Sequence, residues 1–72
     1  MTYEQIVSVL GYAGDHDQAV RIHTTGKIDV IGVPTSVDPH VTAHEVYLRP
    51  GGADETEIAV SLAAIESVEL LN

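Results

Sequence analysis

The sequence contains no cysteine, phenylalanine or tryptophan, and only three of its 72 residues are lysine or arginine. The lack of cysteine excludes disulfide scaffolds, cysteine-based zinc sites and thiol nucleophiles. No apolar run approaches the roughly 18 residues that a membrane-spanning helix needs, and the first ten residues lack the basic and apolar regions of a secretory signal. We therefore expect a cytoplasmic protein that neither spans a membrane nor carries a metal or other cofactor.

The charge is strongly one-sided, with 11 acidic residues against three basic ones and a formal net charge of −8 at pH 7. Nucleic-acid phosphates and acidic membranes are bound mainly through lysine and arginine, so this balance disfavours a membrane surface and broad, nonspecific nucleic-acid binding by a single chain. Solubility is the simplest interpretation of the charge. The more specific interpretation is attraction to a basic protein partner.

The apolar residues point to strands and to self-association. The chain has 10 valines and 6 isoleucines against 5 leucines, and β-branched side chains suit a pleated sheet. A domain of about 60 residues buries only about 60% of the surface that its unfolded chain exposes. Without a large aromatic residue or a disulfide, oligomerisation is the usual remaining source of stability. We therefore expect a homo-oligomer.

The first residues predict a short helix. Thr2 and Gln5 stand at the spacing of a capping box, and apolar side chains follow on one helical face at Tyr3, Ile6, Val7 and Leu10. The pattern predicts a helix over residues 3–12. Gly11 or Gly14 is the expected stop signal, because glycine readily adopts the left-handed conformation that ends helices.

From residue 18 the apolar period changes to two, which predicts five strands, over residues 18–24, 28–33, 42–49, 57–62 and 65–71. The alternation slips by one residue beside Gly32, which predicts a bulge or a sharp bend there. We expect Pro34 to end the second strand, residues 34–41 to form a loop, and Ala63-Ala64 to form a short 3₁₀ turn. The alternative for the C-terminal part is one helix over residues 57–71.

The fold class that follows is mainly β. An N-terminal α-helix precedes a five-stranded small barrel of the SH3-like or Sm-like kind, and one domain spans residues 1–72.

Residues 32–42 carry a resemblance to a known family. Gly32, Val37-Asp38 and His40-Val41-Thr42 resemble the Sm1 motif of Sm-like proteins, and the apolar spacing of residues 60–68 is similar to their Sm2 region. The chain departs from the family at two places. Thr42 stands where the family has asparagine, and Ser61-Leu62 stands where it has arginine and glycine.

The resemblance implies a non-enzymatic module that forms a homo-oligomeric ring by pairing the edge strands of neighbouring copies. It also implies that the 38–42 loop binds single-stranded RNA through Asp38, His40 and Thr42, weakly or in an altered mode because of these departures. A histidine ring can stack on an unpaired base. The alternative function is an acidic barrel that engages a basic protein.

Other site chemistry has little support in the sequence. His40, His44 and Glu45 contain metal-ligating types, but residues four apart in a strand lie roughly 13 Å apart. Ser36, His40 and Asp38 contain the residue types of a nucleophilic triad without the sequence context of a nucleophile elbow. Arg49 precedes a turn, where it either faces a phosphate or lies beside the sheet. We therefore expect no metal site and no catalytic residues.

Overall fold

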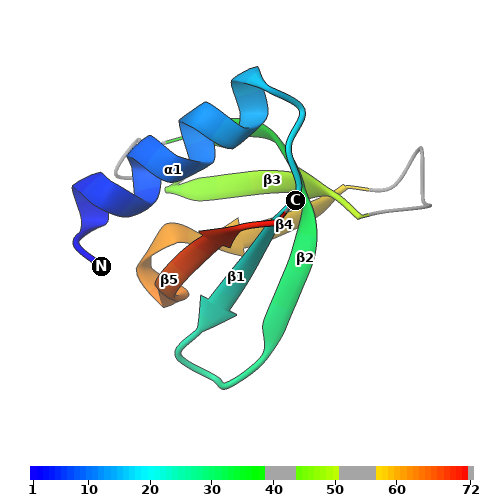
Figure 1. The fold of residues 1–72 in the computed structure, drawn as a ribbon. Coiled ribbons are helices and arrows are strands. Elements are labelled where there is room, and N and C mark those ends of the chain that lie inside the picture. The colour runs from blue at the N-terminus through cyan, green and yellow to red at the C-terminus, as the bar shows by residue number, and fades with distance from the viewer. Residues whose placement is uncertain (39–43, 51–56, 72) are drawn as a thin grey trace.

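A computed structural model describes residues 1–38, 44–50 and 57–71 (Figure 1). A helix is followed by five strands in one antiparallel sheet, with the strand order β4-β3-β2-β1-β5. The elements are α1 (Tyr3–Asp15), β1 (Val20–Thr24), β2 (Asp29–Asp38), β3 (Glu45–Arg49), β4 (Ile58–Ser61), the 3₁₀ turn η1 (Leu62–Ala64) and β5 (Ile65–Leu70). The predicted helix followed by five strands, and the turn at residues 63–64, are confirmed. The alternative of a C-terminal helix is wrong.

Helix α1 begins where the capping box predicts. The Thr2 N–H donates to Gln5 Oε1 over 2.9 Å, and the Gln5 N–H donates to Thr2 Oγ1 over 3.2 Å. The predicted stop is wrong, because α1 continues through both glycines to Asp15. One glycine inside a helix costs only about 1 kcal/mol, and burial of the apolar face of α1 against the sheet offsets this cost.

Strand β2 bends and serves two halves of the sheet. Its first part pairs with β1 as far as Gly32, and its second part pairs with β3 from Val33 onward. A Cβ atom on Gly32 would lie 2.9 Å from the Arg49 carbonyl oxygen, so glycine permits this close approach. The register shift lies between Pro34 and Ser36, a few residues beyond the predicted slip.

Pro34 does not end β2, and residues 34–38 are strand rather than loop, which corrects two predictions. Pro34 pairs with Leu48 inside the β2–β3 ladder. Leu48 lies at a position whose backbone groups face β4, so the nitrogen of Pro34 points away from β3. On that side the β1–β2 pairing stops at Gly32, which lies opposite Val20, the first residue of β1. The missing N–H of Pro34 therefore breaks no bond of the β1–β2 ladder.

The core lies between α1 and the inner face of the curled sheet, and α1 crosses one end of it (Figure 1). Buried apolar side chains of this core come from α1, β1, β3, β4, η1 and β5. The buried side chains are Ile6, Leu10, Ala13, Val20, Ile22, Val46, Leu48, Val60, Leu62, Ile65 and Val68. No helix in the part of the chain that the structure describes is long and apolar enough to cross a membrane.

Candidate functional site

The β5 edge of the sheet presents backbone groups to the outside. The Leu71 N–H donates to the Ala19 carbonyl over 2.9 Å. This bond identifies Ala19 and Leu71 as a hydrogen-bonded pair of the β1–β5 ladder. Hydrogen-bonded and non-hydrogen-bonded pairs alternate in an antiparallel ladder, so Val68 and Leu70 direct their N–H and C=O groups away from β1. Leu70 is also 41% exposed, which leaves an apolar side chain at this edge.

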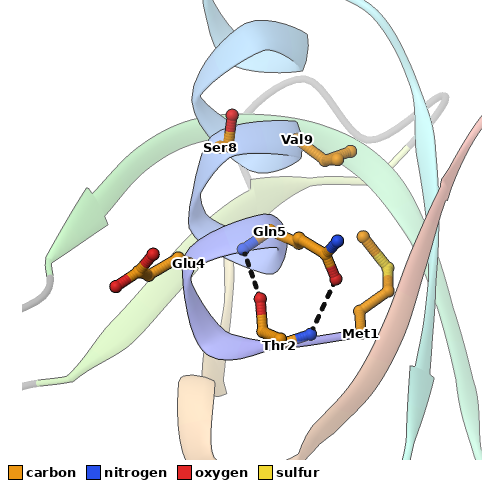
Figure 2. A pocket seen from close by; sticks show the side chains of 6 residues that line it. All are labelled: Met1, Thr2, Glu4, Gln5, Ser8 and Val9. Atoms are coloured by element: carbon orange, nitrogen blue, oxygen red, sulfur yellow. Dashed lines mark hydrogen bonds between the residues drawn. The ribbon is translucent and has the colours of Figure 1, made fainter.

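Met1 lies against this edge. The Val68 N–H donates to Met1 Sδ over 3.3 Å, and Figure 2 shows the Met1 side chain extended beside β5. A thioether sulfur is a weak acceptor. The contact therefore satisfies an outward N–H less well than a strand carbonyl would.

The β4 edge is the second open edge. The Leu62 N–H donates to the His44 carbonyl over 2.9 Å. This bond identifies His44 and Leu62 as a hydrogen-bonded pair, next to the Glu45–Ser61 pair of the β3–β4 ladder. By the same alternation, Ala59 and Ser61 direct their backbone groups away from β3. Within residues 1–38, 44–50 and 57–71, β4 pairs only with β3 and β5 pairs only with β1.

Of the three residues predicted to bind RNA, the structure describes Asp38, which is the last residue of β2 and lies opposite Glu45 of β3. His40 and Thr42 lie outside the described residues. The described residues near Asp38 are Glu45 and Tyr47 of β3 and Glu57, which directly precedes β4.

These neighbours form an acidic face on the outer side of β2, β3 and β4, made by Asp38, Glu45, Tyr47 and Glu57. The Tyr47 hydroxyl donates to Glu45 Oε1 over 3.3 Å. The negative charge of Glu45 raises the pKa of Tyr47 above its usual 10.0, and desolvation and the charges of Asp38 and Glu57 add to this effect. The carboxylates around Tyr47 therefore favour its neutral form over the negatively charged phenolate.

The outer side of β1 and β5 is different, because its charges are paired. Arg21 Nη1 lies 3.2 Å from Glu69 Oε1. The His23 ring lies between two carboxylates, with Nδ1 2.9 Å from Asp29 Oδ1 and Nε2 3.7 Å from Glu69 Oε1. One of the three basic residues of the chain is thus engaged within the fold rather than presented to a ligand.

His44 lies just before β3 and adopts a positive φ of 47°. Its ring stacks on Tyr3 of α1 with a centroid distance of 5.2 Å and an interplanar angle of 6°. The contact ties the start of β3 to the start of α1, and stacked rings of this kind stabilise a fold by about 1 kcal/mol. His44 therefore contributes a ring contact between the start of β3 and α1. No group of His, Asp and Glu side chains among the described residues is arranged to hold a metal ion.

Two hollows flank α1. The larger, about 590 Å³, lies open beside the start of the helix, where Gln5, Ser8 and Val9 line it with the capping residues (Figure 2). Its polar groups at Thr2 and Gln5 already bond each other. The smaller, about 200 Å³, lies between the second half of α1 and β2.

The sequence patterns did not reveal the phase of the two edges, the contact of Met1 with β5, or the hollow between α1 and β2. Of the features of these surfaces, the sequence itself shows the acidic residues and the apolar residue Leu70. Comparison of the chain with protein-family models and with curated proteins finds no match.

Proposed function

We propose that this chain is a non-enzymatic, ring-forming module of the Sm-like kind, whose copies join the β4 edge of one to the β5 edge of the next. The observation that supports this most is the pair of open edges at the two ends of a single sheet. Unpaired strand edges invite association, and closure of a ring removes them. The cytoplasm is the proposed location, which a sequence without cysteine suits.

The two edges suit an antiparallel joint. Pairing brings Ala59 and Ser61 opposite Val68 and Leu70 of the next copy, because these residues point their backbone groups outward. Directly opposed residues place their side chains on the same face. The small side chains of Ala59 and Ser61 then cover Leu70, which is 41% exposed in one chain.

This joint uses different surfaces on the two copies, so repetition gives either a closed ring or an open filament. The resemblance to Sm-like proteins favours the ring. Met1 moves aside in the joint, and the Val68 N–H exchanges the sulfur for a carbonyl oxygen, which is a stronger acceptor.

The test is the native mass of Ala59→Pro. Proline removes the outward N–H of Ala59 and places its ring in the edge, while the β3–β4 ladder keeps its bonds at Val60 and Ile58. Ala59→Val is the matched control, because it keeps the N–H and suits a strand. We expect several subunits for the natural chain and for Ala59→Val, and a monomer for Ala59→Pro.

A second pair of variants, Leu70→Pro and Leu70→Val, repeats the comparison at the other edge. It keeps the test decisive if Ala59→Pro fails to fold. A natural chain that stays monomeric at micromolar concentration contradicts the proposal, as does assembly that both proline variants retain.

The proposed ligand of the ring is single-stranded RNA, held by the 38–42 loop through Asp38, His40 and Thr42. A ring repeats each loop contact, which offsets the few basic residues of one chain. Oligouridine should bind at low salt and dissociate steeply as salt rises. His40→Ala should weaken binding while the melting temperature changes by no more than about two degrees. Absence of binding at low salt would exclude RNA.

The second candidate function is an acidic module that engages a basic protein. The face formed by Asp38, Glu45, Tyr47 and Glu57 favours it, because three carboxylates gather around one tyrosine. Such a field speeds encounters with a positively charged partner and repels phosphates.

A further inference from the structure

Among the described residues, no strand covers one edge of the second half of β2. β1 pairs with β2 only from Asp29 to Gly32, whereas β3 continues along β2 to Asp38. Val37 lies opposite Val46, whose backbone groups face β4, so the N–H and C=O of Val37 point away from β3. No hydrogen bond within the described chain occupies these two groups.

A groove runs along this edge, with a volume of about 200 Å³. Residues 34–37 of β2 form one wall, and the second half of α1 forms the other through Leu10, Gly11, Gly14 and Asp15. Its floor is apolar at Leu10 and its far end is acidic at Asp15. A volume of about 200 Å³ has room for one long side chain beside an extended backbone, but not for a helix.

Gly11 keeps this groove open at a cost to the helix. Glycine inside a helix is less stable than alanine, because it loses more backbone freedom on folding. The two glycines of α1 differ in their surroundings. A Cβ on Gly14 would be crowded, because it would meet the Pro34 oxygen at 3.3 Å. A Cβ on Gly11 would meet no heavy atom of the described residues within 4 Å. The packing of the described residues therefore gives no reason for glycine at position 11.

The charge at the end of the groove selects the occupant. Asp15 is the last residue of α1, where the helix dipole places partial negative charge, and the last turn contains no basic residue. Lysine and arginine have an apolar stem and a cationic end, which match an apolar floor that leads to a carboxylate. A carboxylate or phosphate group would be repelled at the same place.

We propose that the groove between α1 and β2 binds an extended, basic segment of a partner protein. Its backbone adds to β2 at Val37, and one lysine or arginine side chain lies over Gly11 with its charge at Asp15. Strand addition to a free edge supplies affinity through the backbone, and the adjacent pocket supplies specificity. The inference rests on the second candidate function for the class of partner and is independent of ring formation.

The experiment is a titration of the ¹⁵N-labelled full chain with a blocked pentapeptide in which a central lysine is flanked by valine and then threonine on both sides. The same peptide with glutamate at its centre is the control ligand. We expect saturable shifts of the Gly11, Gly14 and Val37 amide signals with the lysine peptide alone.

Gly11→Leu places a large side chain over the groove, with a Cβ that meets no heavy atom of the described residues within 4 Å, and should weaken binding about ten-fold or more. Gly26→Leu is its control, since a Cβ there meets nothing closer than 4.0 Å and position 26 lies in the β1–β2 turn. Asp15→Asn should weaken binding about two- to five-fold. Asp17→Asn makes the same change in net charge outside the groove and should have a smaller effect.

Three outcomes would overturn the proposal, and they can be told apart. Shifts that gather at Glu45 and Tyr47 would place the basic partner on the acidic face, which retains the second candidate function and removes the groove. No saturable shift at all would remove both. Equal shifts of the groove amides with oligouridine would identify a nucleic-acid contact instead.

Discussion

The two halves of the sheet differ in how their charged side chains are arranged. On the outer side of β1 and β5, Arg21, His23, Asp29 and Glu69 form a chain of contacts between opposite or complementary groups. On the outer side of β2 and β3, the carboxylates of Asp38 and Glu45 lie opposite each other at the end of the ladder. The difference is that carboxylates contact basic side chains on one outer face and gather around Tyr47 on the other.

This unequal arrangement bears on both proposed ligands. Paired opposite charges largely cancel each other's field, whereas a group of carboxylates attracts basic partners and repels phosphates. RNA at the 38–42 loop would meet this negative field at Asp38 and Glu45. A basic protein segment would be drawn toward the same half of the sheet, where the groove beside β2 also begins.

The largest expected effect comes from Gly32, where β2 passes from one half of the sheet to the other. In Gly32→Ala, the new Cβ would lie 2.9 Å from a backbone oxygen of Arg49, so the two strands must separate. We expect a loss of about 1–3 kcal/mol in the free energy of unfolding, measured by urea denaturation. Gly26→Ala is the control, because its nearest contact is at 4.0 Å. Equal stability of the two variants would show that the bend does not depend on the close approach.

Much of the fold could be predicted because its signals are local. The capping box of Thr2 and Gln5 and the alternation of each strand depend only on neighbouring residues. Pro34 shows where local reasoning failed. Whether a proline breaks a ladder depends on which side its nitrogen faces and on whether a strand lies there, and β1 has ended at that point. Such a condition joins residues far apart in the sequence.

The helix stop at Gly11 or Gly14 failed for a related reason. The small cost of a glycine is visible in the sequence, but the burial of Leu10 and Ala13 against the sheet, which holds the helix together, is not. The outward phase of Val68 and Ala59 also depends on the ladder partners of each strand. The open edges could be expected from the resemblance, whereas the residues that present them could not.

Removal of one carboxylate from each outer face should change stability by less than the substitution at Gly32, and differently on the two faces. Glu69→Gln removes the carboxylate that contacts both Arg21 and His23, and should destabilise the chain by about 0.2–1 kcal/mol at low salt. Glu45→Gln removes a charge that faces other carboxylates, and should leave stability unchanged or slightly higher. Denaturant unfolding at low and high salt measures both, and added salt should reduce the difference. The same loss of stability in both variants would contradict the contrast between the two faces.

The smallest effect is confined to Tyr47, whose pKa the charge of Glu45 raises above 10.0. The folded chain then holds this phenolic proton more tightly than the unfolded chain does. The corresponding stability is fully present below pH 10.0 and is lost as the pH rises through the higher value of the folded state. In an ultraviolet titration of the three tyrosines, one should ionise late, and Glu45→Gln should bring it back toward the others. An unchanged late titration in that variant would show that Glu45 is not the main source of the field at Tyr47, and the negative potential of this face would then have to come from Asp38 and Glu57.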